Sequence, residues 1–435
     1  LHLNNIPAFG ISGLIRPFSP DVARSMHFTA PLGLHEGIAV FHESHYQYTQ
    51  SGRGNHPYFT NRYASIFNSP DPLRLSQILS GSSYTYPFDR HYMGGYSFIH
   101  WLQYEYGMDI TKNTIEFLSR WPYLGYGAAL RYHTGQWPGS LYQQYASHKR
   151  DLYHSRFDPP TQIYEPVFEN RSENHRRPVW LNNHTILFHA SGYQTRPGFY
   201  LFDVNKDLRT PFVETTSVED FIIDTDSESR IFFYSRYHRH LYYHNHFRMR
   251  IHKVMFDHDF NIHSSDRFFG NQDRIHAPAV FSDDCALALQ NHSENNILVK
   301  VCDTSLDTLL IPETGYLVQV LMKPGNDEEL TILANRNGNQ GIWFISLDEL
   351  NTFDSSDPDI MMSDGSVYDI HWHKNGRILL FSSDMNGAMN LYEYHSNSNR
   401  VYQLTDHRYG IMEGSFSPCG SSISAVQINE NRIEL

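Results

Sequence analysis

The chain has 435 residues, of which 40% are hydrophobic and 19% charged, a composition typical of a soluble globular protein long enough for two domains. Its net charge of −13 argues against nucleic-acid binding, because phosphate contacts need a basic surface, and no run approaches the roughly 18 apolar residues of a membrane span. The three cysteines, Cys285, Cys302 and Cys419, have no CxxC spacing, which excludes a cysteine zinc site and a disulfide scaffold. A pairing of Cys285 with Cys302 stays open, and so does the redox compartment.

Residues 1–157 carry the period of α-helices, so we expect a mostly helical first domain. The stretch EGIAVFHESHYQY places apolar residues at helical spacing on one face, and later stretches repeat the pattern. Gly107 and Gly135 are predicted helix stops, and Thr111 is a predicted cap. The paired prolines in DPPTQ predict a linker over residues 158–165, because helix interiors and central strands do not tolerate them.

From residue 166 onward the period changes to two, which predicts β-strands. Residues 366–405 divide into four short strands with turns at KNG, MNG and SNSN. The second of these strands, ILLF, has counterparts at intervals of roughly 44–56 residues, close to the length of a four-stranded propeller blade. The counterparts are TILF (185–188), RIFF (230–233), LALQ (287–290), LTIL (330–333) and SISA (422–425). We therefore expect a propeller of about six blades over residues 166–435, the last incomplete, with a pair of stacked β-sandwiches as the alternative.

Two stretches, IHWHKNGRILLFSSDMNGAMNLYEY and GSFSPCGSSISAVQI, resemble the TolB-type, WD40-like propeller repeat. In that repeat a polar-x-Gly turn precedes a hydrophobic strand, and an LY strand follows. The resemblance covers about residues 170–435 and is clear in the last two units. It implies a platform that binds a peptide or protein partner, although such a repeat specifies a fold better than a function.

The stretch PLGLHEGIAVFHESH, residues 31–45, contains two His-Glu pairs. On a helix, Glu36 and Glu43 share one face and His35 and His42 lie on a neighbouring stripe, because positions three, four and seven apart nearly coincide. One helix can therefore offer a metal a carboxylate pair or a histidine pair, but not all four groups. The alternative is a partly exposed helix with solvated side chains.

The order of EGIAVFHE, GRGNHPYF, YMGGYSFIHWLQYEYG and YHTGQWPGSLYQQY resembles the gluzincin-type zinc metallopeptidase domain that precedes TolB-like propellers in some bacterial proteins. In that family an HExxH helix supplies two His ligands and the general base, and the Glu of a later EG-x-A motif is the third ligand. The resemblance implies that Glu36 is this zinc ligand and that Glu43 supports it. No HExxH occurs in these residues, and we expect it just upstream of residue 1; a degenerate homologue is the alternative. We therefore expect zinc in the full-length protein, and an inactive chain without that helix.

Tyr92 and Tyr96 lie one helical turn apart beside a Gly pair and are candidate stabilisers of a peptidase oxyanion. Core packing is the alternative for both in an aromatic-rich chain. The histidine-rich tract of residues 238–252 suggests metal binding, but strand alternation scatters its side chains over both faces, so a solvated hairpin is favoured.

These observations leave three functional hypotheses. The first is a cell-envelope or periplasmic metallopeptidase-like protein whose propeller binds a partner or substrate, a location that the resemblance alone implies. The second is a non-enzymatic interaction protein with a degenerate peptidase domain. The third, the propeller of a prolyl-oligopeptidase-type hydrolase, ranks last because it leaves EGIAVFHE unexplained and no G-x-S-x-G motif is present.

Overall fold

A computed structural model of the chain describes residues 9–435 apart from short segments. The segments outside the description are 46–51, 70–71, 81–86, 88, 157–166, 169–172, 193, 216–217, 225–229, 240–246, 268–273, 283–284, 293–294, 303, 314, 337–338, 354–357, 362–364 and 430–431. The predicted linker and the centre of the histidine-rich tract fall within these segments. The chain divides into two compact units, one of Leu1–Asp158 with Asn429–Arg432 and one of Pro159–Ile428 with Ile433–Leu435.

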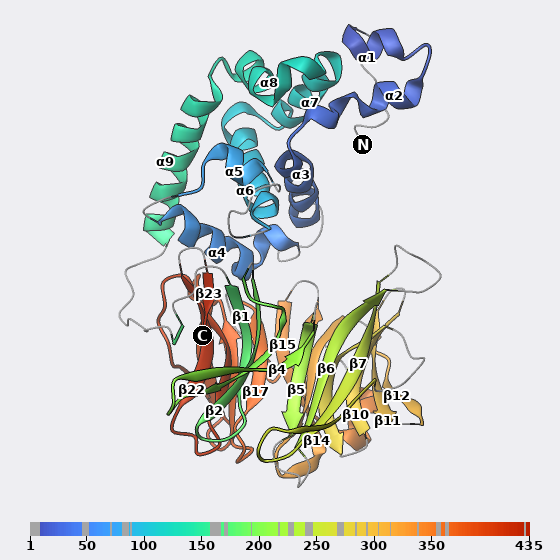
Figure 1. Cartoon of the computed structure of the whole chain (residues 1–435), viewed down its shortest axis with the longest axis vertical. Coiled ribbons are helices and arrows are strands. Elements are labelled where there is room, and N and C mark those ends of the chain that lie inside the picture. Colours follow the sequence, from blue (N-terminus) through green and yellow to red (C-terminus); the bar gives the residue numbers. More distant parts are fainter. Residues whose placement is uncertain are drawn as a thin grey trace. The chain divides into compact units, whose positions relative to one another are not determined.

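The first unit is helical, as its sequence period predicts (Figure 1). Its α-helices are α1 (Gly10–Ile15), α2 (Pro20–Arg24), α3 (Leu32–His45), α4 (Pro57–Phe67), α5 (Leu75–Leu79), α6 (Arg90–Tyr106), α7 (Ile110–Arg120), α8 (Gly125–Thr134) and α9 (Pro138–Arg156). Three short 3₁₀ segments, η2 (Ser25–Thr29), η3 (Arg53–Asn55) and η4 (Pro122–Leu124), connect them. None of the helices in the described part of the chain is long and apolar enough to cross a membrane.

Glycine ends two of these helices where the sequence predicts it. Gly107 follows α6 with φ 90° and Gly135 follows α8 with φ 75°, conformations that favour a residue without a Cβ. The prediction for Thr111 is wrong. Helix α7 begins at Ile110 after Asp109, and Thr111 is buried inside it, where its hydroxyl accepts a hydrogen bond from Gln103.

Helices α3 and α6 pack backbone to backbone through glycines. A Cβ on Gly95 of α6 would overlap the carbonyl oxygen of Gly33, and a Cβ on Gly37 of α3 would lie 2.6 Å from the backbone nitrogen of Tyr96. Any side chain at these positions would force the helices apart. The close approach brings the polar side chains of α3 and α6 near one another.

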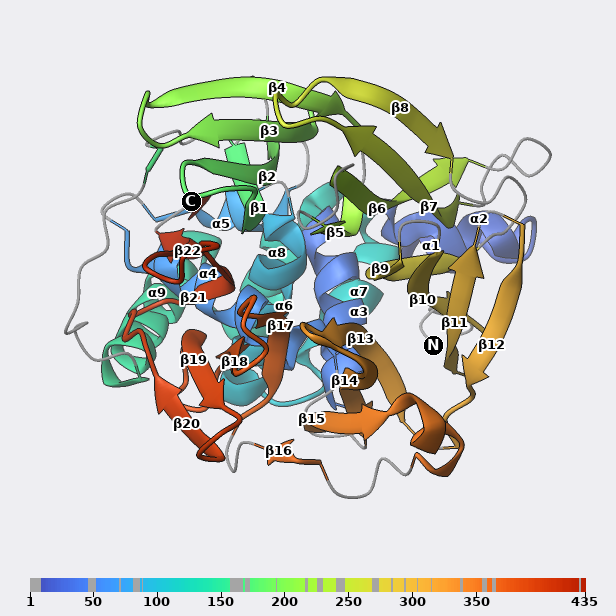
Figure 2. The ribbon, with the colours of Figure 1, turned by 90° about the horizontal axis from the view of Figure 1, so that it is seen from below.

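The second unit is a β-propeller (Figure 2), which confirms the predicted fold. The described strands form five sheets: one of seven strands, β21-β22-β23-β1-β2-β3-β4, and four of four strands each, numbered consecutively from β5 to β20. The strand bounds of the first three sheets in chain order are β1 (Glu173–Trp180), β2 (Thr185–Gly192), β3 (Gly198–Asp203), β4 (Leu208–Glu214), β5 (Val218–Asp224), β6 (Arg230–Arg239), β7 (Phe247–Phe256), β8 (Ile262–Arg267), β9 (Ile275–Ser282), β10 (Cys285–Asn291), β11 (Asn296–Cys302) and β12 (Leu306–Leu310). The remaining strands are β13 (Tyr316–Lys323), β14 (Asn326–Arg336), β15 (Asn339–Ser346), β16 (Ile360–Met361), β17 (Val367–Trp372), β18 (Ile378–Ser383), β19 (Asn390–His395), β20 (Arg400–Gln403), β21 (Ile411–Phe416), β22 (Ile423–Asn429) and β23 (Arg432–Glu434), with η5 (Leu347–Thr352) after β15.

The propeller has five blades, and the expected six is wrong. The predicted sixth unit does not form a sheet of its own, because β23 pairs in parallel with β1 and carries β21 and β22 into the first blade. Each predicted repeat of the ILLF strand nevertheless coincides with or lies largely within one strand, namely β2, β6, β10, β14, β18 or β22. The sequence period therefore located the strands, while their pairing decided the number of blades.

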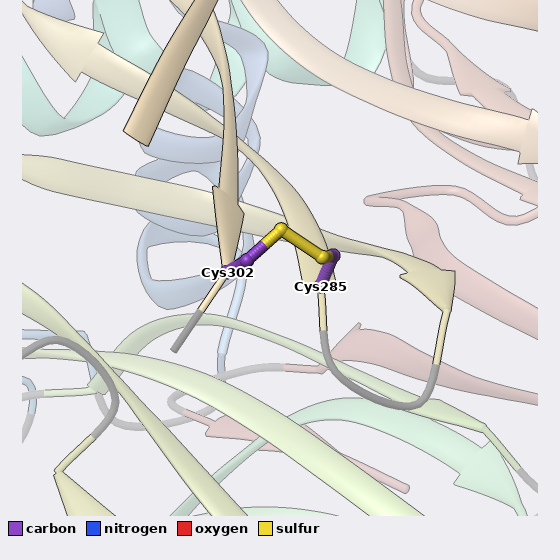
Figure 3. Close-up of a disulfide and its surroundings, with 2 residues drawn as sticks. All are labelled: Cys285 and Cys302. Carbon is purple, nitrogen blue, oxygen red and sulfur yellow. A yellow bond between two sulfur atoms is a disulfide. The ribbon is translucent and has the colours of Figure 1, made fainter. Parts of the chain in front are cut away.

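Cys285 and Cys302 form a disulfide between neighbouring antiparallel strands (Figure 3). They lie directly opposite each other in the register of β10 and β11. The cross-link was left open by the sequence, because two cysteines 17 residues apart meet only if the two strands pair in this register. Cys419 is a free and exposed thiol.

Candidate functional site

The two carboxylates on α3 have different environments. Glu43 accepts hydrogen bonds from Arg53 of η3 at three donors: Nε at 2.6 Å, Nη2 at 3.2 Å and the backbone nitrogen at 3.1 Å. Burial raises the pKa of Glu43, but the bonds from Arg53 outweigh it and hold that pKa below its ordinary value. Both oxygens of Glu43 are therefore committed to Arg53.

Glu36 lies two helical turns earlier on α3 and is half-buried. Its carboxylate has no hydrogen bond or ion pair among the residues that the structure describes. Its negative charge nevertheless reaches Arg53, whose pKa is raised chiefly by the bonds to Glu43 and further by Tyr92 and Glu36. Of the predicted carboxylate pair, only Glu36 keeps its oxygens available.

Tyr92 of α6 lies under the same guanidinium. The Cζ atom of Arg53 is 4.7 Å from the centre of the Tyr92 ring, a distance typical of a cation–π contact. The structure thus brings Glu36, Glu43 and Tyr92 together around Arg53. Arg53 was not predicted as a site residue, because its only local signal in the sequence is a Gly-flanked arginine in GRGNH.

Tyr96 has a different environment from Tyr92. It is 9% exposed, and burial raises the pKa of its phenol. Its ring stacks on His100 at 5.9 Å and lies 6.1 Å from the ring of His45, while Gly54 of η3 packs against it. These contacts indicate that Tyr96 packs in the interface between α3 and α6.

A zinc ion needs at least three protein ligands. Across the described residues, no three His, Cys, Asp or Glu side chains group closely enough to hold a metal ion. Glu36 supplies one available carboxylate, and the rest of a zinc site is not formed by the described part of this chain.

No protein-family model and no curated protein sequence matches this chain. Among solved structures, it is similar to TolB from Acinetobacter baumannii, with 12% identity and a TM-score of 0.41 over 57% of this chain and 58% of that one. A protein assigned as TolB from Agrobacterium tumefaciens has 14% identity and a TM-score of 0.44 over 60% of this chain and 92% of that one. An oligogalacturonate lyase from Vibrio parahaemolyticus has 10% identity and a TM-score of 0.41 over 64% and 94%.

The chain thus spans less than two thirds of the length of the Acinetobacter TolB. At these identities and TM-scores the likenesses carry no argument about activity, partner or location. The propeller assignment rests on the strand order of this chain.

Proposed function

We propose that the helical unit is part of a gluzincin-type zinc peptidase domain and that the propeller binds the peptide or protein on which it acts. The observation that supports the proposal is the contrast on α3: Arg53 occupies both oxygens of Glu43, while Glu36 keeps its own carboxylate available. A metal ligand needs such an available carboxylate. Glu43, which is held by its hydrogen bonds to Arg53, suits a residue that supports and orients the site.

In this proposal Glu36 is the third zinc ligand, and two His ligands and the general base come from an HExxH helix upstream of residue 1. The hydrogen bonds from Arg53 to Glu43 hold the end of α3 against η3. The Arg53 guanidinium also contacts the face of the Tyr92 ring and orients it. The Tyr92 hydroxyl would donate to the oxyanion formed when water attacks a peptide carbonyl. Tyr96 has a structural role at the same interface. When bound, zinc would lower the pKa of a water molecule toward neutrality.

The test is zinc content, measured by elemental analysis, in a protein extended upstream through its native start. We expect about one zinc per chain in the extended protein. Glu36→Gln should remove most of it, because an amide is a poor zinc ligand, while the matched control Glu105→Gln, on an exposed part of α6, should keep it. An extended protein without zinc, or a Glu36→Gln variant with undiminished zinc, contradicts the assignment.

A second candidate function is a non-enzymatic interaction protein that carries a degenerate peptidase domain. The lack of any three-ligand group among the described residues favours it. The same zinc measurement separates the two candidates, since the interaction protein predicts no zinc in either variant.

We also propose export to the periplasm or cell envelope. The Cys285–Cys302 disulfide supports this location, because disulfides persist in oxidising compartments and are rare in the cytosol. Fractionation of the native host, with this protein detected by antibody, tests the location; recovery in the cytosolic fraction alone contradicts it.

A further inference from the structure

We propose that the central cavity of the propeller binds a peptide segment through a lysine or arginine side chain, with the Asp369 carboxylate as the partner of the cation. This site lies wholly in the propeller and does not depend on the zinc assignment. The proposal rests on a cavity, on the ion pairs around it, and on one carboxylate that takes part in none of these pairs.

The cavity has a volume of about 380 Å³, within the range of small-ligand sites. Most of its lining comes from β1, β5, β9, β13, β17 and β21, the strands that face the middle of the ring in Figure 2, and Asp327 of β14 adds to it. Its walls combine apolar side chains, among them Phe221, Ile223, Phe281, Leu321, Met322 and Trp372, with charged and polar ones. Such walls suit the hydrocarbon stem of a long side chain and the apolar residues beside it.

A β-bulge recurs in the strands that line the cavity. The register shifts between Arg176 and Val179 in β1, between Tyr368 and His371 in β17 and between Met412 and Ser415 in β21. A bulge turns a side chain away from the ordinary alternation of a strand. Arg177, Asp369 and Glu413, which lie at these bulges, have positive φ angles of 47°, 46° and 55° and all line the cavity.

Two of these three charged residues are paired. Glu413 accepts bonds from the guanidinium of Arg176 at 2.9 and 3.1 Å and from the backbone nitrogen of Arg177 at 2.6 Å. Arg177 in turn makes an ion pair with Asp220 at 2.5 Å. The two guanidiniums are thereby matched by the carboxylates of Glu413 and Asp220.

Asp369 is the carboxylate that these ion pairs do not include. It has no hydrogen bond and no ion pair within 4 Å among the described residues, although it is half-buried. Burial and the neighbouring Glu413 charge raise its pKa to about 6, against the opposing effect of Arg177. A half-buried carboxylate without a close hydrogen-bond or ion-pair partner favours a cation as its ligand.

The other titratable groups that line the cavity do not supply this cation. Lys323 makes an ion pair with Glu329 at 2.8 Å. Burial lowers the pKa of His371 to about 4, so this imidazole is uncharged at neutral pH. Asp327, exposed at the rim, adds a further negative charge. Gln319 is also committed, because its amide bonds the backbone nitrogen and oxygen of Ile370.

The test is isothermal titration calorimetry with acetyl-phenylalanyl-lysine amide on this chain as it stands. The comparison ligand is acetyl-phenylalanyl-norleucine amide, which keeps the apolar stem without the charge. The variant is Asp369→Asn, which keeps the size of the side chain and tolerates a positive φ. The control is Asp307→Asn, the same charge change at an exposed position of β12 outside the cavity.

We expect the lysine ligand to bind the wild-type protein and the Asp307→Asn control alike. Binding should weaken about ten-fold or more for the norleucine ligand and for Asp369→Asn. A circular-dichroism melt of Asp369→Asn shows that the variant is folded. Equal affinity for both ligands, undiminished binding to a folded Asp369→Asn, or no binding of the lysine ligand at about 10 mM overturns the proposal.

Discussion

Asp369 lowers the stability of the folded protein at neutral pH, although the surrounding strand β17 keeps it in place. It combines a positive φ with a carboxylate that has no close partner, two features that each oppose folding. Glu413, at the same kind of bulge in β21, is fully bonded. The fold therefore tolerates a charge in the cavity at one bulge and neutralises it at another.

Replacing Asp369 by Asn should stabilise the protein at neutral pH. The folded pKa of about 6 lies above the ordinary value of 3.8, so wild-type stability from this group is full at low pH and is lost as the pH rises through about 6. Urea denaturation should show Asp369→Asn more stable by about 1–3 kcal/mol at pH 7, and the advantage should vanish below about pH 4. Asp307→Asn should show no such pH dependence. An advantage of equal size at both pH values contradicts the assignment.

At the scale of elements, the α3–α6 pair depends on residues that have no side chain. Gly33 and Gly37 on α3 meet Gly95 on α6 at a spacing that leaves no room for a Cβ on Gly37 or Gly95. This contact brings α3, which carries Glu36 and Glu43, close to α6, which carries Tyr92. The candidate site thus rests on the closeness of two helices as much as on its own side chains.

Gly95→Ala should destabilise the helical unit by about 2–4 kcal/mol, because the new Cβ overlaps the carbonyl oxygen of Gly33 and the helices must separate. Gly139→Ala on α9 is the matched control. Nothing lies within 4 Å of its added Cβ, so the change should be neutral or stabilising by up to about 1 kcal/mol. Thermal melts followed by circular dichroism give both values. A Gly95→Ala protein as stable as the control would show that α3 and α6 are not in backbone contact.

The disulfide belongs to the same scale, since it joins β10 to β11. A Cys285→Ser/Cys302→Ser double variant should lose about 2–4 kcal/mol, as expected for a cross-link that closes a short loop. Cys419→Ser should have little effect, because that thiol is exposed. Thiol titration of the denatured, unreduced wild type should find one free thiol, and three after reduction. Three thiols before reduction contradict the pairing.

For the propeller as a whole, stability depends on how its ring closes. The first and last strands share the seven-stranded sheet through the pairing of Asn174 with Ile433. The Ser415 hydroxyl donates to the carbonyl of Pro178 at 2.7 Å, and the backbone of Leu435 bonds Val167 and the His175 ring. These contacts join residues that are more than 200 positions apart in the sequence.

Removing residues 432–435 should lower the melting temperature of the propeller by several degrees, because β23 and both Leu435 hydrogen bonds are lost together. Leu435→Ala keeps the backbone bonds and should cause a smaller fall, from lost burial alone. Differential scanning calorimetry resolves the two. A truncated protein that melts like the wild type shows that the ring does not need this closure.

The residues alone determined the two kinds of unit, the helix stops at Gly107 and Gly135, and the recurring second strand of the propeller repeat. These features follow from local periods and from glycine conformations, which a short stretch of sequence contains. The helix start at Thr111 was misplaced by two residues from Asp109, because several polar residues there can begin a helix.

Tertiary structure alone decided the rest. Five blades formed because β23 pairs with β1, a contact that no local pattern encodes. Arg53 reaches Glu43, ten residues earlier in the chain, and Cys285 meets Cys302 through strand register. The bulges aim Arg177, Asp369 and Glu413 into one cavity, although the two-residue period of a strand does not place them there. In each case the deciding interaction joins different helices or strands, and it forms only once the chain has folded.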